Sequence, residues 1–226
     1  MHQRWDDVVF AHWPVVPEAV AALLPGGLRP DVFDGTAWVS LVPFRMRDLR
    51  LRALPPIPTT REFAEVNVRT YVQGPEGPGV WFCSLDATHA LPVVTARAAY
   101  GLPYFRARVD CHVTAERDGP IVDWAVRRRG TDAPGRLTVL ARSEPIDDPL
   151  AVFLTARWRL YTGRRRVWTA MVEHDPWPLL AGEPLDWDPG LVDAAGLRVD
   201  GAPLVHWSPG VDVTVGRPYR AGRHRG

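Results

Sequence analysis

The chain has 226 residues, of which 46% are hydrophobic and 23% charged, a composition typical of a globular protein large enough to form a core. Its 27 basic and 26 acidic residues give a formal net charge of +1, so the basic excess by which nucleic-acid-binding proteins neutralise phosphates is missing. No apolar run approaches the roughly 18 residues of a membrane-spanning helix, and the first residues lack the pattern of a signal peptide, so we expect a cytoplasmic protein with neither nucleic acid nor membrane as a partner.

Prolines and glycines divide the sequence into short apolar runs, which predicts many strands joined by turns. Residues 17–24 predict a short helix with Pro17 at its first position. Asp148 and Pro149 predict the N-cap and the first residue of a second helix. Strands are predicted for residues 36–44, 63–72, 79–85, 167–174 and 203–215.

The strand predicted over residues 63–72 carries polar side chains on one face only. The face with small apolar residues consists of Ala64, Val66, Val68, Thr70 and Val72. The other face consists of Phe63, Glu65, Asn67, Arg69 and Tyr71. An acid, an amide and a guanidinium between two aromatic residues are typical either of the solvated face of an edge strand or of the wall of a ligand cavity. For a cavity wall, we expect Glu65 and Arg69 to point into the interior of the sheet and Val66 and Val68 to pack beneath helices.

A second informative segment, TARAAYGLPYFRARVD, spans residues 95–110 and is interrupted at residues 101–103. Beyond the interruption, apolar and polar residues alternate, which predicts a half-exposed strand. Arg97 precedes it among small residues. A buried guanidinium there would need a partner, because an unpaired buried charge is costly, and Glu65 is a candidate partner.

The segment around Arg97 resembles the acetoacetate decarboxylase superfamily, in which an arginine, a glycine and a proline precede two lysines. Arg97, Gly101 and Pro103 match this pattern, whereas Tyr104 and Phe105 occupy the positions of the lysines. In that superfamily the first lysine is the Schiff-base nucleophile and the second lowers its pKa. The resemblance therefore implies a fold, while the substitutions exclude imine-based decarboxylation.

The whole chain more closely resembles the YqjF-like family of uncharacterised proteins (domain of unknown function 2071), which is assigned to the same fold superfamily. The matching motifs, in order from residue 10 to about residue 213, are FAHWPV, FDGTAWVSLVPF, FAEVNVRTYV, GVWFCSLDA, YGLPYFRA, FLTARWRLY, HDPWPL and LVHWSPGVDV. The resemblance implies a β-rich α+β fold, with a curved, partly closed, antiparallel barrel-like sheet and short peripheral helices. We expect one domain over residues 1–216 and a disordered basic tail over residues 217–226.

These patterns favour a small-molecule pocket lined by Glu65, Asn67, Arg69, Arg97 and Tyr104. In an enzyme, Glu65 and Tyr104 would be the catalytic residues, Glu65 as general acid or base and Tyr104 as a hydrogen-bond donor to a developing oxyanion. Asn67, Arg69 and Arg97 would bind the substrate, since an arginine holds a carboxylate bidentately. The expected partner is a small organic acid, and the expected reaction is that of a lyase, isomerase or hydrolase.

Two alternatives stay open: a non-catalytic binding protein with the same pocket, and a structural protein in which Glu65 pairs with an arginine. We expect no metal and no cofactor, because HExxH, CxxC and glycine-rich phosphate motifs are missing from the sequence. His12, His174 and His206 are instead expected to be half-buried and hydrogen-bonded to the backbone. Cys83 and Cys111 are expected to be core thiols, with a single bridge left open, and the sequence allows a homo-oligomer.

The sequence contains no lysine, so no side chain can form a Schiff base on an ε-amine. We expect that treatment with acetoacetate and borohydride leaves no stable adduct on any side chain. Mass spectrometry of the treated protein measures this. An adduct anywhere except on the terminal amine would contradict the prediction.

Overall fold

The strands of the described residues join into one 13-stranded sheet. The computed structural model describes residues 1–50, 62–88, 101–131, 133–163 and 165–222. The strands are β1 (His2–Val15), β2 (Arg29–Pro30), β3 (Ala37–Arg50), β4 (Glu62–Gly74), β5 (Gly77–Ala87), β6 (Tyr104–Thr114), β7 (Ile121–Arg128), β8 (Pro134–Pro145), β9 (Arg159–Thr162), β10 (Trp168–His174), β11 (Leu180–Asp188), β12 (Leu204–Val215) and β13 (Tyr219–Arg220). The helices are α1 (Pro17–Ala21), α3 (Pro149–Thr155) and α4 (Gly190–Ala194).

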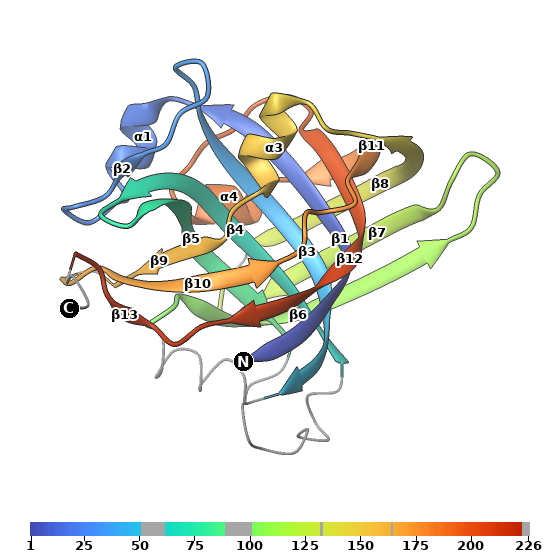
Figure 1. Cartoon of the computed structure of the whole chain (residues 1–226). Coiled ribbons are helices and arrows are strands. Elements are labelled where there is room, and N and C mark those ends of the chain that lie inside the picture. Colours follow the sequence, from blue (N-terminus) through green and yellow to red (C-terminus); the bar gives the residue numbers. More distant parts are fainter. Residues whose placement is uncertain (51–61, 89–100, 132, 164, 223–226) are drawn as a thin grey trace.

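The sheet curves round and closes on itself (Figure 1). Hydrogen bonds link the strands in the order β5-β6-β7-β8-β11-β12-β1-β3-β4, and β4 pairs in turn with β5. A second connection runs from β5 through β9 and β10 to β12. The pairs are antiparallel except for β5–β6 and β5–β9, which are parallel. The structure thus confirms the expected curved, partly closed, β-rich fold with short helices outside the sheet.

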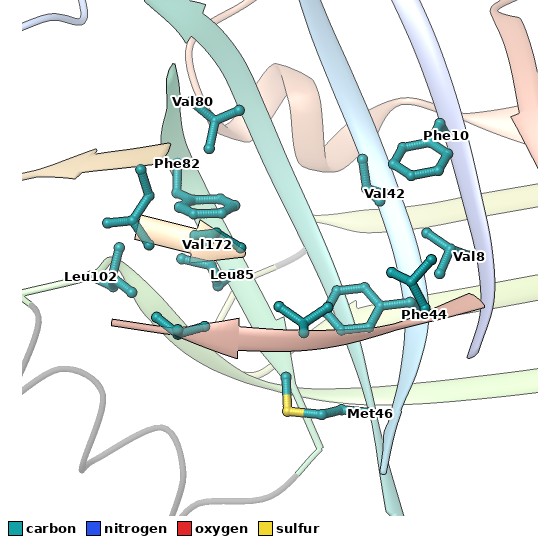
Figure 2. Packing of buried hydrophobic residues seen from close by; sticks show 14 of the residues in the cluster. Val8, Phe10, Val42, Phe44, Met46, Val80, Phe82, Leu85, Leu102 and Val172 are labelled. Carbon is teal, nitrogen blue, oxygen red and sulfur yellow. The ribbon is translucent and has the colours of Figure 1, made fainter. Parts of the chain in front are cut away.

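Strand β1 belongs to both closed connections, and its successive side chains, which point to opposite sides of the strand, enter two different hydrophobic clusters. On β1, Val8 and Phe10 belong to one hydrophobic cluster, whereas Val9 and Ala11 belong to another. The first cluster includes Val8, Phe10, Val42, Phe44, Met46, Val80, Phe82, Leu85, Leu102 and Val172, drawn in Figure 2. The second cluster includes Val9, Ala11, Trp13, Val39, Leu41, Val66, Val68, Trp124, Leu137 and Val139.

Each helix covers one of the two clusters. Ala151 and Leu154 of α3 are buried in the first cluster. Val20 of α1 and Leu191 of α4 are buried in the second cluster, which also holds Val66 and Val68 of β4. These two valines are therefore buried in the same cluster as residues of α1 and α4.

The helix signals in the sequence mark real helix starts. Pro17 occupies the first turn of α1, which ends at Ala21 rather than at residue 24. The side chain of Asp148 accepts a hydrogen bond from the amide of Ala151 at 2.9 Å, as expected of the N-cap of α3. None of the described helices is long and apolar enough to cross a membrane.

The chain departs from the expected layout at both ends. The first residues form the long strand β1, which pairs with β3 and β12 and was not predicted. The tail was expected to be disordered from residue 217, but Tyr219 and Arg220 form β13 against β10. The hydroxyl of Tyr219 accepts a hydrogen bond from Arg159 at 2.8 Å, an interaction between distant segments that composition does not reveal.

Candidate functional site

The polar face of β4 lies inside the molecule. Glu65, Asn67 and Arg69 are 3%, 2% and 5% exposed, and they alternate with Val66 and Val68 of the second cluster. Phe63 and Tyr71, at the two ends of the same face, belong to the first cluster. The solvated-edge interpretation of this strand is therefore wrong, because β4 is paired on both sides, with β3 and with β5.

Glu65 and Tyr104, the two residues predicted to be catalytic, are brought together. The Tyr104 hydroxyl donates a hydrogen bond to Oε2 of Glu65 at 3.1 Å. Burial raises the pKa of Glu65 from its ordinary value of 4.5 to about 8; the hydrogen bond from Tyr104 opposes this shift and the charge of Asp86 adds to it. At neutral pH Glu65 is consequently a protonated carboxylic acid that can donate a hydrogen bond or a proton.

Arg69 contacts the end of α3 rather than Glu65. Its Nη2 donates to the carbonyl oxygen of Leu154 at 3.1 Å, and its guanidinium lies over the rings of Phe10 and Tyr71. The last carbonyls of a helix have no partner within the helix and carry partial negative charge. A single carbonyl and two aromatic faces thus hold this cation.

The other buried arginines have carboxylate partners. Arg128 forms a fork with Asp86, its Nε 2.7 Å from one carboxylate oxygen and its Nη2 2.8 Å from the other. Arg157 lies 2.6 Å from Asp31. Among the described residues, Arg69 has no such ion pair, and its Nε is buried without a hydrogen-bond partner. The proposed structural pair between Glu65 and Arg69 is not formed, and Arg97, the other proposed partner, lies outside the described residues.

A row of polar residues continues from Arg69 across the neighbouring strands. Arg69 of β4 lies directly opposite Ser40 of β3, and Ser40 lies directly opposite His12 of β1. Nδ1 of His12 is 2.6 Å from Oγ of Ser40, which is also 2.6 Å from the hydroxyl of Tyr71. The Tyr71 hydroxyl donates to the Leu154 carbonyl at 2.7 Å, the same oxygen that accepts from Arg69.

Four side chains of this region each have a buried polar atom without a partner among the described residues. They are Nε2 of His12, Oδ1 of Asn67, Nε of Arg69 and Nδ1 of His206. The rings of His12 and His206 are 5.3 Å apart. Buried polar groups are nearly always hydrogen-bonded in folded proteins, so these four atoms have hydrogen-bonding capacity that the described residues do not use.

The histidines differ from the expectation of half-buried rings bonded to the backbone. His12 is 0% exposed and bonds to side chains; its pKa is lowered well below the ordinary value by burial, then by His206 and Arg69. Burial also lowers the pKa of His206. Only for His174 does a backbone bond occur as expected, to the carbonyl of Asp175 at 2.7 Å. The sequence shows that each of these histidines has a tryptophan one or three residues after it. It does not show which residue of another strand the imidazole contacts.

The remaining candidate ligands and nucleophiles are cysteines, histidines and carboxylates. No group of three or more histidine, cysteine, aspartate or glutamate residues there could hold a metal ion. Cys83 and Cys111 are free, half-buried thiols. Burial raises their pKa values to about 12 and about 11, which makes both weak nucleophiles at neutral pH.

Several solved structures share the fold, and three of them serve as examples. The enzyme MppR of enduracididine biosynthesis, complexed with pyruvate, is 17% identical, with a TM-score of 0.71 over 98% of this chain and 90% of that chain. An acetoacetate decarboxylase-like enzyme from Sphingomonas wittichii RW1 is 15% identical, with a TM-score of 0.69 over 97% and 93%. The acetoacetate decarboxylase from Legionella pneumophila is 11% identical, with a TM-score of 0.67 over 97% and 87%. At such identities the likeness shows the fold alone.

Sequence comparison is more specific. The model of the DUF2071 family, described as an uncharacterized conserved protein, matches residues 2–212. The uncharacterized protein YqjF of Bacillus subtilis (strain 168) is 38% identical over 219 residues, which cover 94% of this chain and 89% of the relative. The chain therefore belongs to the DUF2071 family of uncharacterized conserved proteins and has an acetoacetate decarboxylase-like fold.

Proposed function

We propose that the chain binds a small organic acid inside the sheet and that Arg69 contacts the carboxylate of this ligand. The observation that carries the proposal is the buried guanidinium of Arg69, which has no carboxylate partner among the described residues, whereas Arg128 and Arg157 each have one. A buried charge without a counter-ion is costly. The planar guanidinium also matches a carboxylate in geometry, so a bound acid would supply the missing partner.

The neighbouring groups suit recognition of, and chemistry on, such a ligand. Asn67 lies between Glu65 and Arg69 on the same face of β4, and its unpaired Oδ1 can accept a hydrogen bond. Glu65, protonated at neutral pH, has a proton to donate, and the hydroxyl of Tyr104 donates its single proton to Glu65 at 3.1 Å in the unliganded chain. This arrangement supports a lyase, isomerase or hydrolase in which Glu65 transfers a proton and Tyr104 stabilises an oxyanion. Arg97 is part of the same proposal as a second substrate-binding residue.

A non-catalytic binding protein is the alternative that uses the same contacts. It is favoured by the apolar residues of the first cluster that surround the polar groups. The Glu65→Gln variant distinguishes an enzyme from a non-catalytic binding protein by its effect on turnover. In an enzyme this change abolishes turnover and leaves acid binding intact, whereas in a binding protein no turnover exists to be lost.

The proposal predicts opposite behaviour for two buried arginines. We expect Arg69→Gln to abolish the stabilisation of the protein by pyruvate, the acid bound by the structural neighbour MppR, while its own melting temperature equals or exceeds that of the wild type. Arg157→Gln should leave pyruvate binding intact and lower the melting temperature, because it leaves Asp31 without its partner. Thermal melts with and without pyruvate, and calorimetric titration, measure both effects.

The same experiment can overturn the proposal. It fails if Arg69→Gln binds pyruvate as tightly as the wild type does. It also fails if acetate, propionate, pyruvate and lactate all leave the melting temperature of the wild type unchanged at millimolar concentration.

A further inference from the structure

The buried chain of hydrogen bonds from Leu154 to His12 has a defined direction. The carbonyl oxygen of Leu154 can only accept, so the single hydroxyl proton of Tyr71 points to it at 2.7 Å. The bond of 2.6 Å between Tyr71 and Ser40 must then use the proton of Ser40. With that proton committed, the bond of 2.6 Å between Ser40 and His12 requires a proton on Nδ1 of His12.

The direction of this chain decides the tautomer of His12. A neutral imidazole carries one proton, and here that proton is on Nδ1, so Nε2 is an acceptor with a free lone pair. His12 is neutral because burial lowers its pKa, with His206 and Arg69 as the nearby charge centres that lower it further. Asp148 acts in the opposite direction on His206. Nε2 of His12 is buried and has no partner among the described residues.

The acceptor on His12 and the cation of Arg69 lie within reach of one small molecule. His12, Ser40 and Arg69 are direct neighbours across β1, β3 and β4. Adjacent strands are about 4.8 Å apart, so the Cα atoms of His12 and Arg69 are roughly 10 Å apart, and the two long side chains extend from the same face of the sheet. Arg69 lies close enough to His12 for its charge to lower the pKa of the imidazole.

We propose that the ligand of this site is a small hydroxy acid, whose carboxylate binds Arg69 and whose hydroxyl donates a hydrogen bond to Nε2 of His12. The inference rests on the proposed function and names its substrate class. An oxo acid has a carboxylate but no hydroxyl proton, and it would leave the His12 acceptor unpaired. An amino acid has a donor, but its ammonium group would add a positive charge close to the guanidinium of Arg69, which has no carboxylate partner among the described residues. A hydroxy acid satisfies both groups without adding a cation.

Three acids with the same carbon skeleton test the proposal. Calorimetric titration of the wild type at neutral pH with lactate, pyruvate and propionate should give binding of lactate at least about tenfold tighter than that of the other two, because a site with an unpaired acceptor discriminates against ligands that lack the donor. Equal binding of the three acids would overturn the hydroxy-acid inference and leave the proposed function standing. Binding of none of them would overturn both.

Two variants test the role of the hydrogen-bond chain. His12→Asn keeps a donor toward Ser40 and removes Nε2, so it should bind lactate and pyruvate equally. Tyr71→Phe releases the proton of Ser40, which can then donate to Nδ1 of His12 and move the ring proton to Nε2. This variant should reverse the preference and bind pyruvate more tightly than lactate. Retention of the wild-type preference for lactate by either variant contradicts the inference.

A measurement on the unliganded wild type needs neither a variant nor a ligand. NMR chemical shifts of the imidazole nitrogens, assigned to His12 by their absence from His12→Asn, should show a protonated Nδ1 and an unprotonated Nε2. A proton on Nε2 would overturn the assigned direction of the hydrogen-bond chain, independently of how tightly lactate, pyruvate and propionate bind.

Discussion

Glu65→Gln is expected to raise the stability of the protein, and to do so increasingly as the pH rises from 5 to 8. The pKa of Glu65 is about 8 in the folded chain against an ordinary value of 4.5. Between these two values the folded state holds a proton that the unfolded state releases, so the free energy of unfolding falls as the pH rises. Each pH unit above the ordinary pKa of Glu65 lowers the free energy of unfolding by about 1.4 kcal/mol. At pH 7 the ionisable Glu65 therefore destabilises the folded state by on the order of 3 kcal/mol.

Glutamine removes the ionisation and keeps the shape of the protonated acid. Its side-chain oxygen can still accept the hydrogen bond that Tyr104 donates to Oε2 of Glu65 at 3.1 Å in the wild type. For a chain of this length, about 3 kcal/mol corresponds to a rise of roughly 10 °C in melting temperature. Thermal melts of the wild type and Glu65→Gln at pH 5, 7 and 8 measure the expected divergence.

Glu62 provides a matched control on the same strand. Its side chain is 49% exposed and forms surface ion pairs with Arg45 and Arg47 at 3.6 and 3.4 Å, so Glu62→Gln should change stability by less than about 1 kcal/mol at every pH. A loss of stability in Glu65→Gln at all three pH values would instead mean that Glu65 is the structural counter-ion of a guanidinium, and it would remove Glu65 from the proposed proton-transfer role.

The second large effect is expected at the ion pair between Asp86 and Arg128. The side chains are 0% and 6% exposed, and the guanidinium of Arg128 lies 4.0 Å from the centre of the Phe105 ring. Asp86→Asn removes the carboxylate and leaves a buried guanidinium without a counter-ion, a change that typically costs about 3–5 kcal/mol. The melting temperature should fall by about 10 °C or more.

An exposed pair of the same composition provides the control. Arg108 and Asp110 lie 2.9 Å apart, with side chains 78% and 45% exposed, so Asp110→Asn should change the free energy of unfolding by less than about 1 kcal/mol. Urea unfolding at pH 7 compares the two variants. If Asp86→Asn costs no more than Asp110→Asn, the buried pair does not hold the fold together as its geometry suggests.

The sequence alone determined those features that depend on neighbouring residues. The alternation over residues 63–72 placed Glu65, Asn67 and Arg69 on one face, because side chains of a strand alternate with a period of two. Asp148 before Pro149 marked the start of α3, because a cap bonds within its own turn. The missing lysine excluded imine chemistry by composition, and the ordered motifs predicted the family, which the comparisons confirm.

Only the tertiary structure decided which groups meet. The sequence pattern of a polar strand face is the same whether the face is exposed to water or enclosed by the sheet. In this chain the pairing of β4 with β5 and the closure of the sheet bury the polar face of β4. The row from His12 through Ser40 to Arg69 depends on the register of three strands. Register is selected by packing over the whole sheet. The tautomer of His12 depends in turn on where α3 places the carbonyl of Leu154, more than eighty residues along the chain from Tyr71.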